Sequence, residues 1–151
     1  MGGNFMQDIK LNNETINNVY KNAHIALQSI SNVLPEVTDQ KMRDELNLQY
    51  DGYDKFIGKL SSFMRDNNIE AKDVNVMKKA MLFTSVKMNT LTDDSTSHIA
   101  DMMIKGTVMG ITELRQLISR GQDKISGEII DYAKELLSLE ESFEERLKTY
   151  L

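Results

Sequence analysis

Two segments of the chain repeat apolar residues at alternating spacings of three and four, which is the pattern of a helix that packs one face against a core. One stripe runs Met42, Leu46, Gln49, Tyr53, Phe56, Leu60, Phe63, and the other runs Ile129, Tyr132, Ala133, Leu136, Glu140, Phe143, Leu147. Each stripe is interrupted once by a polar side chain, Gln49 in the first and Glu140 in the second. Because a buried polar group needs hydrogen-bond partners, we expect these two side chains to pair with each other or with His24.

The same periodicity predicts helices along most of the chain, at about 13–34, 39–65, 73–91 and 94–119, and a last helix from about Asp123 or Ser126 to the C-terminus. Pro35 ends the first helix, and Thr38 or Asp39 is expected to cap the second. Gly121 is expected to be the glycine that follows the fourth helix. Residues 1–12 are expected to form a flexible arm and residues 13–151 a single all-α domain.

The lengths of the predicted connections constrain the topology. The connections after the first and the fourth helix are short, so each of these helices should form an antiparallel hairpin with the next one. The 73–91 helix would be about 30 Å long at a rise of about 1.5 Å per residue. It is therefore long enough to carry the chain back along the bundle between the two hairpins. We expect a four-helix bundle of two antiparallel hairpins with one additional crossover helix.

With this register and topology, residues 13–151 resemble the ferritin-like and rubrerythrin-like superfamily, and most closely its small uncharacterised bacterial members. The family's di-metal site takes a glutamate from each of two helices and a Glu-x-x-His pair from each of the other two. In this chain the first Glu-x-x-His pair is replaced by Gln49 and Gly52. The second pair keeps its carboxylate in Glu140, but Phe143 stands in place of the histidine.

Counting back from the hairpin turns locates the two remaining ligand positions. The level of Gln49 on the first helix is near Ala23 and His24. The level of Glu140 on the fourth helix is near Met102, Met103 or Gly106. Neither level has a glutamate.

The resemblance therefore implies a di-metal site that has been lost, with Glu140 as its remaining carboxylate. The alternative is a metal-binding oxidoreductase or storage protein with a non-standard site for Fe, Mn or Zn, formed by Glu140, Gln49 and His24.

A second candidate site consists of Asp94, His98 and Asp101, which are spaced so that they share one helical face. Two carboxylates and an imidazole could bind a single Zn²⁺, Mn²⁺ or Fe²⁺ ion. The structural alternative is that Asp94 caps the helix and Asp101 pairs with His98 as a neighbour on the same face.

Gly106 and Gly110 lie one helical turn apart in the fourth helix. Each glycine costs a helix about 1 kcal/mol relative to alanine, so the pair indicates close approach of another helix. That helix comes either from inside the bundle or from a second subunit. The second case predicts a homo-oligomer, for example a dimer through the Gly106/Gly110 face.

Composition excludes several classes of function. The chain has no cysteine, which rules out disulfides, thiolate metal sites and thiol catalysis. The net charge of −5 and the scattered Lys and Arg residues argue against a nucleic-acid partner. No stretch approaches the roughly 18 apolar residues of a membrane span, and no signal peptide is recognisable, so a cytoplasmic protein is expected.

Catalytic motifs are missing from the chain, and two histidines leave little scope for acid–base chemistry. Taken together, the sequence favours a non-catalytic helical protein that acts through oligomerisation or protein–protein interaction.

Overall fold

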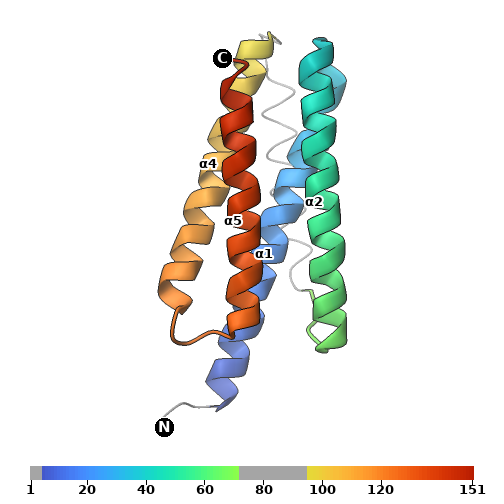
Figure 1. Ribbon diagram of the computed structural model, residues 1–151. Coiled ribbons are helices and arrows are strands. Elements are labelled where there is room, and N and C mark those ends of the chain that lie inside the picture. Colours follow the sequence, from blue (N-terminus) through green and yellow to red (C-terminus); the bar gives the residue numbers. More distant parts are fainter. Residues whose placement is uncertain (1–4, 72–94) are drawn as a thin grey trace.

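The computed structural model describes residues 5–71 and 95–151, and in these ranges the chain is helical without any strand. The helices are α1 (Phe5–Val33), α2 (Gln40–Asp66), α4 (Thr96–Gly121) and α5 (Gly127–Lys148), and the 3₁₀ turn η1 (Leu34–Glu36) joins α1 to α2 (Figure 1). The all-α prediction is confirmed. The predicted crossover helix at 73–91 lies outside the described residues.

The four helices lie roughly along one axis and form two hairpins, α1 with α2 and α4 with α5 (Figure 1). The α1 helix also packs against α4 and α5, whereas α2 and α5 make a smaller contact. Helices α1 and α5 run in one direction, and α2 and α4 run in the opposite direction (Figure 1). Consequently, α2 ends at one end of the bundle and α4 begins at the other.

Local side-chain hydrogen bonds define where the helices start. Asp39 caps α2 as predicted, because its carboxylate accepts a hydrogen bond from the backbone N–H of Met42 at 2.9 Å. The cap of α4 is Ser95, whose Oγ accepts a hydrogen bond from the N–H of His98 at 3.3 Å, and Asp94, the cap in the structural alternative, lies outside the described residues.

Two helix ends differ from the sequence prediction. Gly121 is the last residue of α4 and has no positive φ, so its role is not that of a left-handed glycine after the helix. A Cβ at this position would instead collide with the side chain of Ile125. At the other end of the chain, residues 5–12 belong to α1 rather than to an arm. Asn12 Oδ1 accepts a hydrogen bond from the backbone N–H of Ser126 at 2.8 Å, which joins this part of α1 to the α4–α5 connection.

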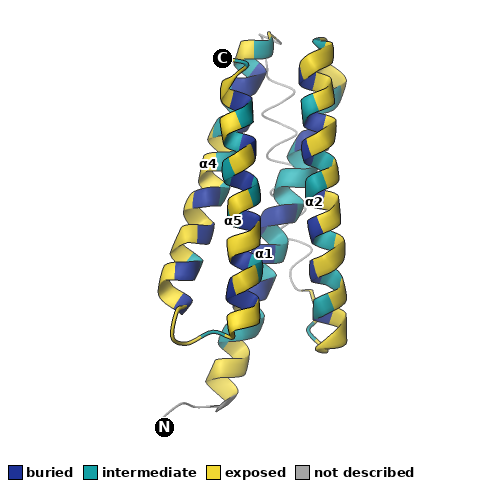
Figure 2. Cartoon of the chain, in the orientation of Figure 1, coloured by how far each residue is buried: buried dark blue, intermediate teal, exposed yellow. Residues whose placement is uncertain are grey.

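Both predicted stripes face the core of the bundle, as the buried residues in Figure 2 show. The only difference on α2 is at its end, where Met64 is buried and Phe63 is half-buried. The core is apolar except for four buried polar residues in the described ranges, which are Thr15, Asn22, Gln49 and Glu140. Within the same ranges, none of the helices has an apolar stretch long enough to cross a membrane.

Candidate functional site

Glu140 lies on the buried face of α5, with 1% of its surface exposed. One carboxyl oxygen, Oε2, accepts a hydrogen bond from the hydroxyl of Tyr53 on α2 at 3.2 Å. The other oxygen, Oε1, has no hydrogen-bond partner among the described residues. Burial raises the pKa of Glu140 to about 8, the Tyr53 hydrogen bond opposes this shift, and the negative charge of Glu113 adds to it. Burial therefore favours the neutral form of this carboxyl.

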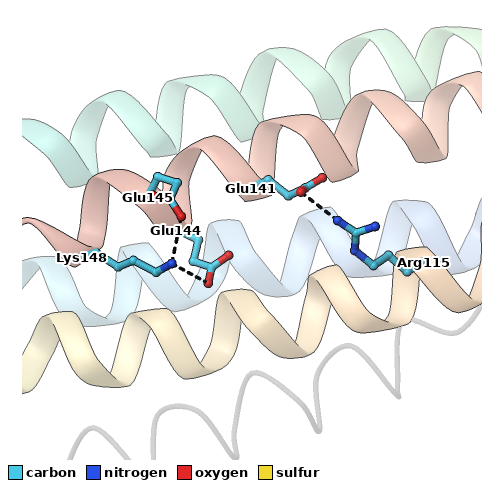
Figure 3. Close-up of polar contacts among 5 residues, drawn as sticks. All are labelled: Arg115, Glu141, Glu144, Glu145 and Lys148. Carbon is cyan, nitrogen blue, oxygen red and sulfur yellow. Dashed lines mark hydrogen bonds and ion pairs between the residues drawn. The ribbon is translucent and has the colours of Figure 1, made fainter.

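The next residue has the opposite environment. Glu141 faces outwards and forms an ion pair with Arg115 of α4 at 2.8 Å. Figure 3 shows the polar contacts of this outer face, which join Arg115 to Glu141 and Lys148 to Glu144 and Glu145. Because successive helical residues are about 100° apart, one glutamate enters the core while its neighbour remains at the surface.

Glu140 belongs to a polar cluster that also includes Asn22, Tyr53, Gly110 and Glu113. Asn22 is the member from α1, and 5% of its surface is exposed. Its Nδ2 donates hydrogen bonds to the backbone carbonyl of Gly110 at 3.1 Å and to Oε2 of Glu113 at 3.4 Å. Its Oδ1 has no partner among the described residues. A single side chain of α1 is thus bound to the middle of α4.

Gly110 makes room for the buried carboxyl. A Cβ at this position would lie 2.8 Å from Oε1 and 3.2 Å from Oε2 of Glu140, and 3.3 Å from Oδ1 of Asn22. The close approach indicated by this glycine is therefore inside the bundle. Gly106 differs, because it is exposed and a Cβ there would meet no atom within 4 Å.

Gln49 is buried on α2 but is not hydrogen-bonded to Glu140. Its Nε2 donates to Oε2 of Glu45 at 2.9 Å. The other oxygen of Glu45 forms an ion pair with Arg146 of α5 at 3.0 Å. The amide is thus satisfied by a neighbour one turn away on its own helix, and this neighbour links α2 to α5.

Gly52 and Phe143, which the resemblance predicts to stand in place of histidine ligands, contact each other. A Cβ on Gly52 would lie 2.8 Å from Cζ of Phe143, so the phenyl ring fills the space beside the glycine. The same ring meets Tyr53 edge-on, with 5.3 Å between centroids, and the guanidinium of Arg146 lies 5.8 Å from its centroid. These positions are occupied by packed core rather than by metal-binding side chains.

His24 is separate from this cluster. Its ring packs against Tyr20, with 4.4 Å between centroids, and partial burial lowers its pKa. It follows Asn22 by two residues, which places the two side chains about 200° apart around α1. The expected pairing of His24 with Gln49 or Glu140 does not occur, and the residue of α1 that faces the cluster is Asn22.

The second predicted metal site is described only in part, because Asp94 lies outside the described residues. Asp101 accepts a hydrogen bond from Nζ of Lys105 at 2.8 Å and forms an i,i+4 ion pair with it. The predicted pairing of Asp101 with His98 is replaced by this contact.

The residues present do not fit a pair of divalent cations. The candidate positions offer one buried carboxyl whose pKa is raised, the amides of Asn22 and Gln49, a glycine and a phenyl ring. Amides carry no negative charge, and Gly52 and Phe143 offer no ligand. Throughout ranges 5–71 and 95–151, no three His, Asp or Glu side chains lie together in a way that could hold a metal ion.

Three members of the cluster were not recognised in the sequence, namely Asn22, Tyr53 and Glu113. Asn22 carried the same signal as Gln49, because it lies on a stripe with Thr15, Val19 and Ala23, all buried. Tyr53 lies on the apolar stripe of α2, and its spacing there gives no sign that its hydroxyl bonds a buried carboxyl. Glu113 is exposed, so no burial pattern could have identified it.

Comparisons of this chain with protein-family models, with curated proteins and with solved structures found no match. What the fold and the site define is therefore a class: an all-helical bundle with a buried polar cluster to which α1, α2, α4 and α5 all contribute.

Proposed function

We propose that this chain is a non-catalytic, ferritin-like helical bundle in which a di-metal site has been replaced by packed and hydrogen-bonded core, and that it acts through association with itself or with other proteins. The observation that carries the proposal is the contact of Gly52 with Phe143. A glycine and an aromatic ring at the two histidine positions complement each other in shape. Such complementarity is typical of a core that selection has repacked rather than of a damaged metal site.

Two further observations support this proposal. Helices α2 and α4 run in the same direction, which is the arrangement of a bundle with one long connection between its hairpins. In addition, Asn22, Gly110 and Glu140 come together in the middle of the bundle from three different helices. This is where side chains from facing helices hold a metal pair in the ferritin-like family.

Metal analysis tests the loss of the site. Protein purified without chelator is expected to contain far less than one Fe, Mn or Zn per chain, with no difference between the wild type and Glu140→Gln. The matched control is Glu141→Gln, because Glu141 is the adjacent carboxylate but faces solvent. Stoichiometric metal that disappears in Glu140→Gln and remains in Glu141→Gln would overturn the proposal and favour the oxidoreductase or storage alternative. Metal that disappears only in His98→Ala would favour the mononuclear site.

The surface of α4 is the part of the described chain that we propose for association. Gly106 is open to solvent, and Met109, three residues further on the same side of the helix, is 74% exposed, while Val108 beside it in the sequence is 40% exposed. Large apolar side chains exposed within one turn of a helix favour contact with a partner over contact with water.

Light scattering on the native protein tests this face. We expect the wild type to have a molar mass above that of one chain, and Met109→Lys to have a lower molar mass than the wild type. Leu48→Lys is the control, because Leu48 is 50% exposed on α2. Gly110 is unsuitable as a probe, since a side chain there would collide with the buried carboxyl. A mass that is the same for the wild type and Met109→Lys would count against association through α4.

A further inference from the structure

Three buried polar atoms have no hydrogen-bond partner among the described residues: Oδ1 of Asn22, Nε2 of His24 and Oε1 of Glu140. Two of them, the oxygens of Asn22 and Glu140, surround the same point beside Gly110. The position of the missing Cβ lies 3.3 Å from the first oxygen and 2.8 Å from the second. An amide oxygen and an ionised carboxyl oxygen are both hydrogen-bond acceptors. Burying two acceptors side by side without a donor costs free energy, unless one of them carries a hydrogen atom.

The orientation of the Asn22 amide follows from its other neighbours. Its Nδ2 lies 3.1 Å from the carbonyl oxygen of Gly110 and 3.4 Å from Oε2 of Glu113. The flipped amide would direct its oxygen at these two acceptors, so the neighbours on α4 select the orientation in which Nδ2 faces them. Oδ1 is then the atom that faces the carboxyl of Glu140.

On this geometry we propose that Glu140 is a neutral carboxylic acid whose Oε1–H group donates a hydrogen bond to Oδ1 of Asn22. One proton then satisfies both oxygens and completes a chain of hydrogen bonds through the four helices. Tyr53 of α2 donates to Glu140 of α5, Glu140 donates to Asn22 of α1, and Asn22 donates to the Gly110 carbonyl of α4.

Every hydrogen bond in this chain has one donor and one acceptor, and all of them run in the same direction from Tyr53 to Gly110. The hydroxyl of Tyr53 and the amide of Asn22 each act as donor on one side, and both carboxyl oxygens of Glu140 are used. The glycine at 110 is needed because a Cβ there would lie within 3.3 Å of both oxygens and would crowd them. This role in holding the helices together is independent of whether the bundle once held metal.

Removal of the proton would break the chain of hydrogen bonds. An ionised Glu140 would place a negative charge against the oxygen of Asn22. Among residues 5–71 and 95–151, the titratable groups that face it are the Tyr53 hydroxyl of α2 and the Glu113 carboxylate of α4, while α1 contributes the neutral amide of Asn22. Neither group supplies a positive charge to compensate, so the contact between the helices should weaken at alkaline pH.

The test is a pH titration of protein labelled with ¹³C at the glutamate side-chain carboxyls, followed by NMR. Glu140→Gln identifies the signal, which in the wild type should be that of a protonated carboxyl at pH 6.5 and should titrate near pH 8. Tyr53→Phe should move the midpoint upwards, because the hydroxyl hydrogen-bonds the ionised form. Asn22→Ala should move it downwards, because the neutral form loses its acceptor.

Thr15→Val is the matched control on α1, since Thr15 is buried and bonds only within its own helix, to the Leu11 carbonyl. It should leave the midpoint unchanged. A Glu140 carboxyl that is ionised at pH 6.5, or a midpoint that is the same in Asn22→Ala as in the wild type, would overturn the proposal. If Asn22→Ala does not fold, infrared difference spectra of the wild type and Glu140→Gln at pH 6.5 decide whether the protonated carboxyl is present.

Discussion

The phenyl ring of Phe143 occupies the space that a side chain at position 52 would fill, since a Cβ on Gly52 would lie 2.8 Å from Cζ of the ring. The two residues belong to α5 and α2, and each follows a buried polar residue by three positions. The ring is held on its other sides by Tyr53 and Arg146. A substitution at either position should therefore alter the packing of the other residue.

Gly52→Ala should destabilise the protein by about 1 kcal/mol. Alanine gains helix propensity, but the new Cβ forces the buried ring of Phe143 out of its packed position. Gly58→Ala is the matched control on the same helix, because a Cβ there meets no atom within 4 Å, and it should stabilise by about 0.5–1 kcal/mol. Urea denaturation of the two variants measures the difference. Equal stabilisation by both would show that the ring moves aside without cost.

Gly110→Ala should destabilise more than Gly52→Ala. The new methyl group would lie within 3.3 Å of three oxygens, two from Glu140 and one from Asn22, and would displace buried polar groups from their hydrogen-bonded positions. We expect a loss of about 2 kcal/mol or more in the free energy of unfolding. The control is Gly106→Ala, which fills open space on the same helix and should be stabilising. If Gly110→Ala were more stable than Gly106→Ala, the result would contradict the close approach of α4 to α5.

The stability of the protein should fall as the pH rises from about 4.5 to about 8. The pKa of Glu140 is raised from 4.5 to about 8 in the fold, chiefly by burial. Between these values the folded state holds a proton that the unfolded state releases, so raising the pH favours unfolding. Below this window both states are protonated, and above it both are ionised, so the contribution to the slope vanishes. The total effect is on the order of a few kcal/mol.

Glu140→Gln should remove most of this pH dependence. The glutamine side chain can accept from Tyr53 and donate to Asn22 at any pH, so the free energy of unfolding of Glu140→Gln should exceed that of the wild type increasingly from pH 5 to about pH 8 and by a constant amount above it. Chemical denaturation across this range, with Glu141→Gln as the surface control, measures the effect. A wild type and Glu140→Gln that show parallel pH profiles would contradict a protonated carboxyl in the core.

Gln49→Met should change the free energy of unfolding by no more than about 1 kcal/mol. Methionine has nearly the same shape, and its loss of the hydrogen bond to Glu45 leaves that carboxylate paired with Arg146. Thermal or urea denaturation measures the change. A loss of several kcal/mol would indicate that the amide has a partner beyond Glu45.

The part of the site that was predicted from sequence is the burial of Gln49 and Glu140, because a residue's place on a stripe depends only on its spacing from its neighbours. Their partners were predicted incorrectly. Counting back across the α4–α5 hairpin predicts that Glu140 lies level with Met102, Met103 or Gly106, whereas the structure places Gly110 beside it. That prediction takes Gly121 as the turning point of the hairpin. Because α5 begins only at Gly127, the turning point lies in the middle of the connection, and the levels on α4 shift towards its end.

The sequence by itself determined the four described helices apart from residues 5–12, their inward faces, and a cap at Thr38 or Asp39, since all of these depend on residues within one or two turns of each other. It also determined that two polar side chains would be buried. Only the tertiary structure decided that Asn22, Gly110 and Glu140 meet, and that Phe143 closes over Gly52. Such meetings depend on how far each helix is rotated and shifted against its neighbours, and this is decided by the packing of all helices together.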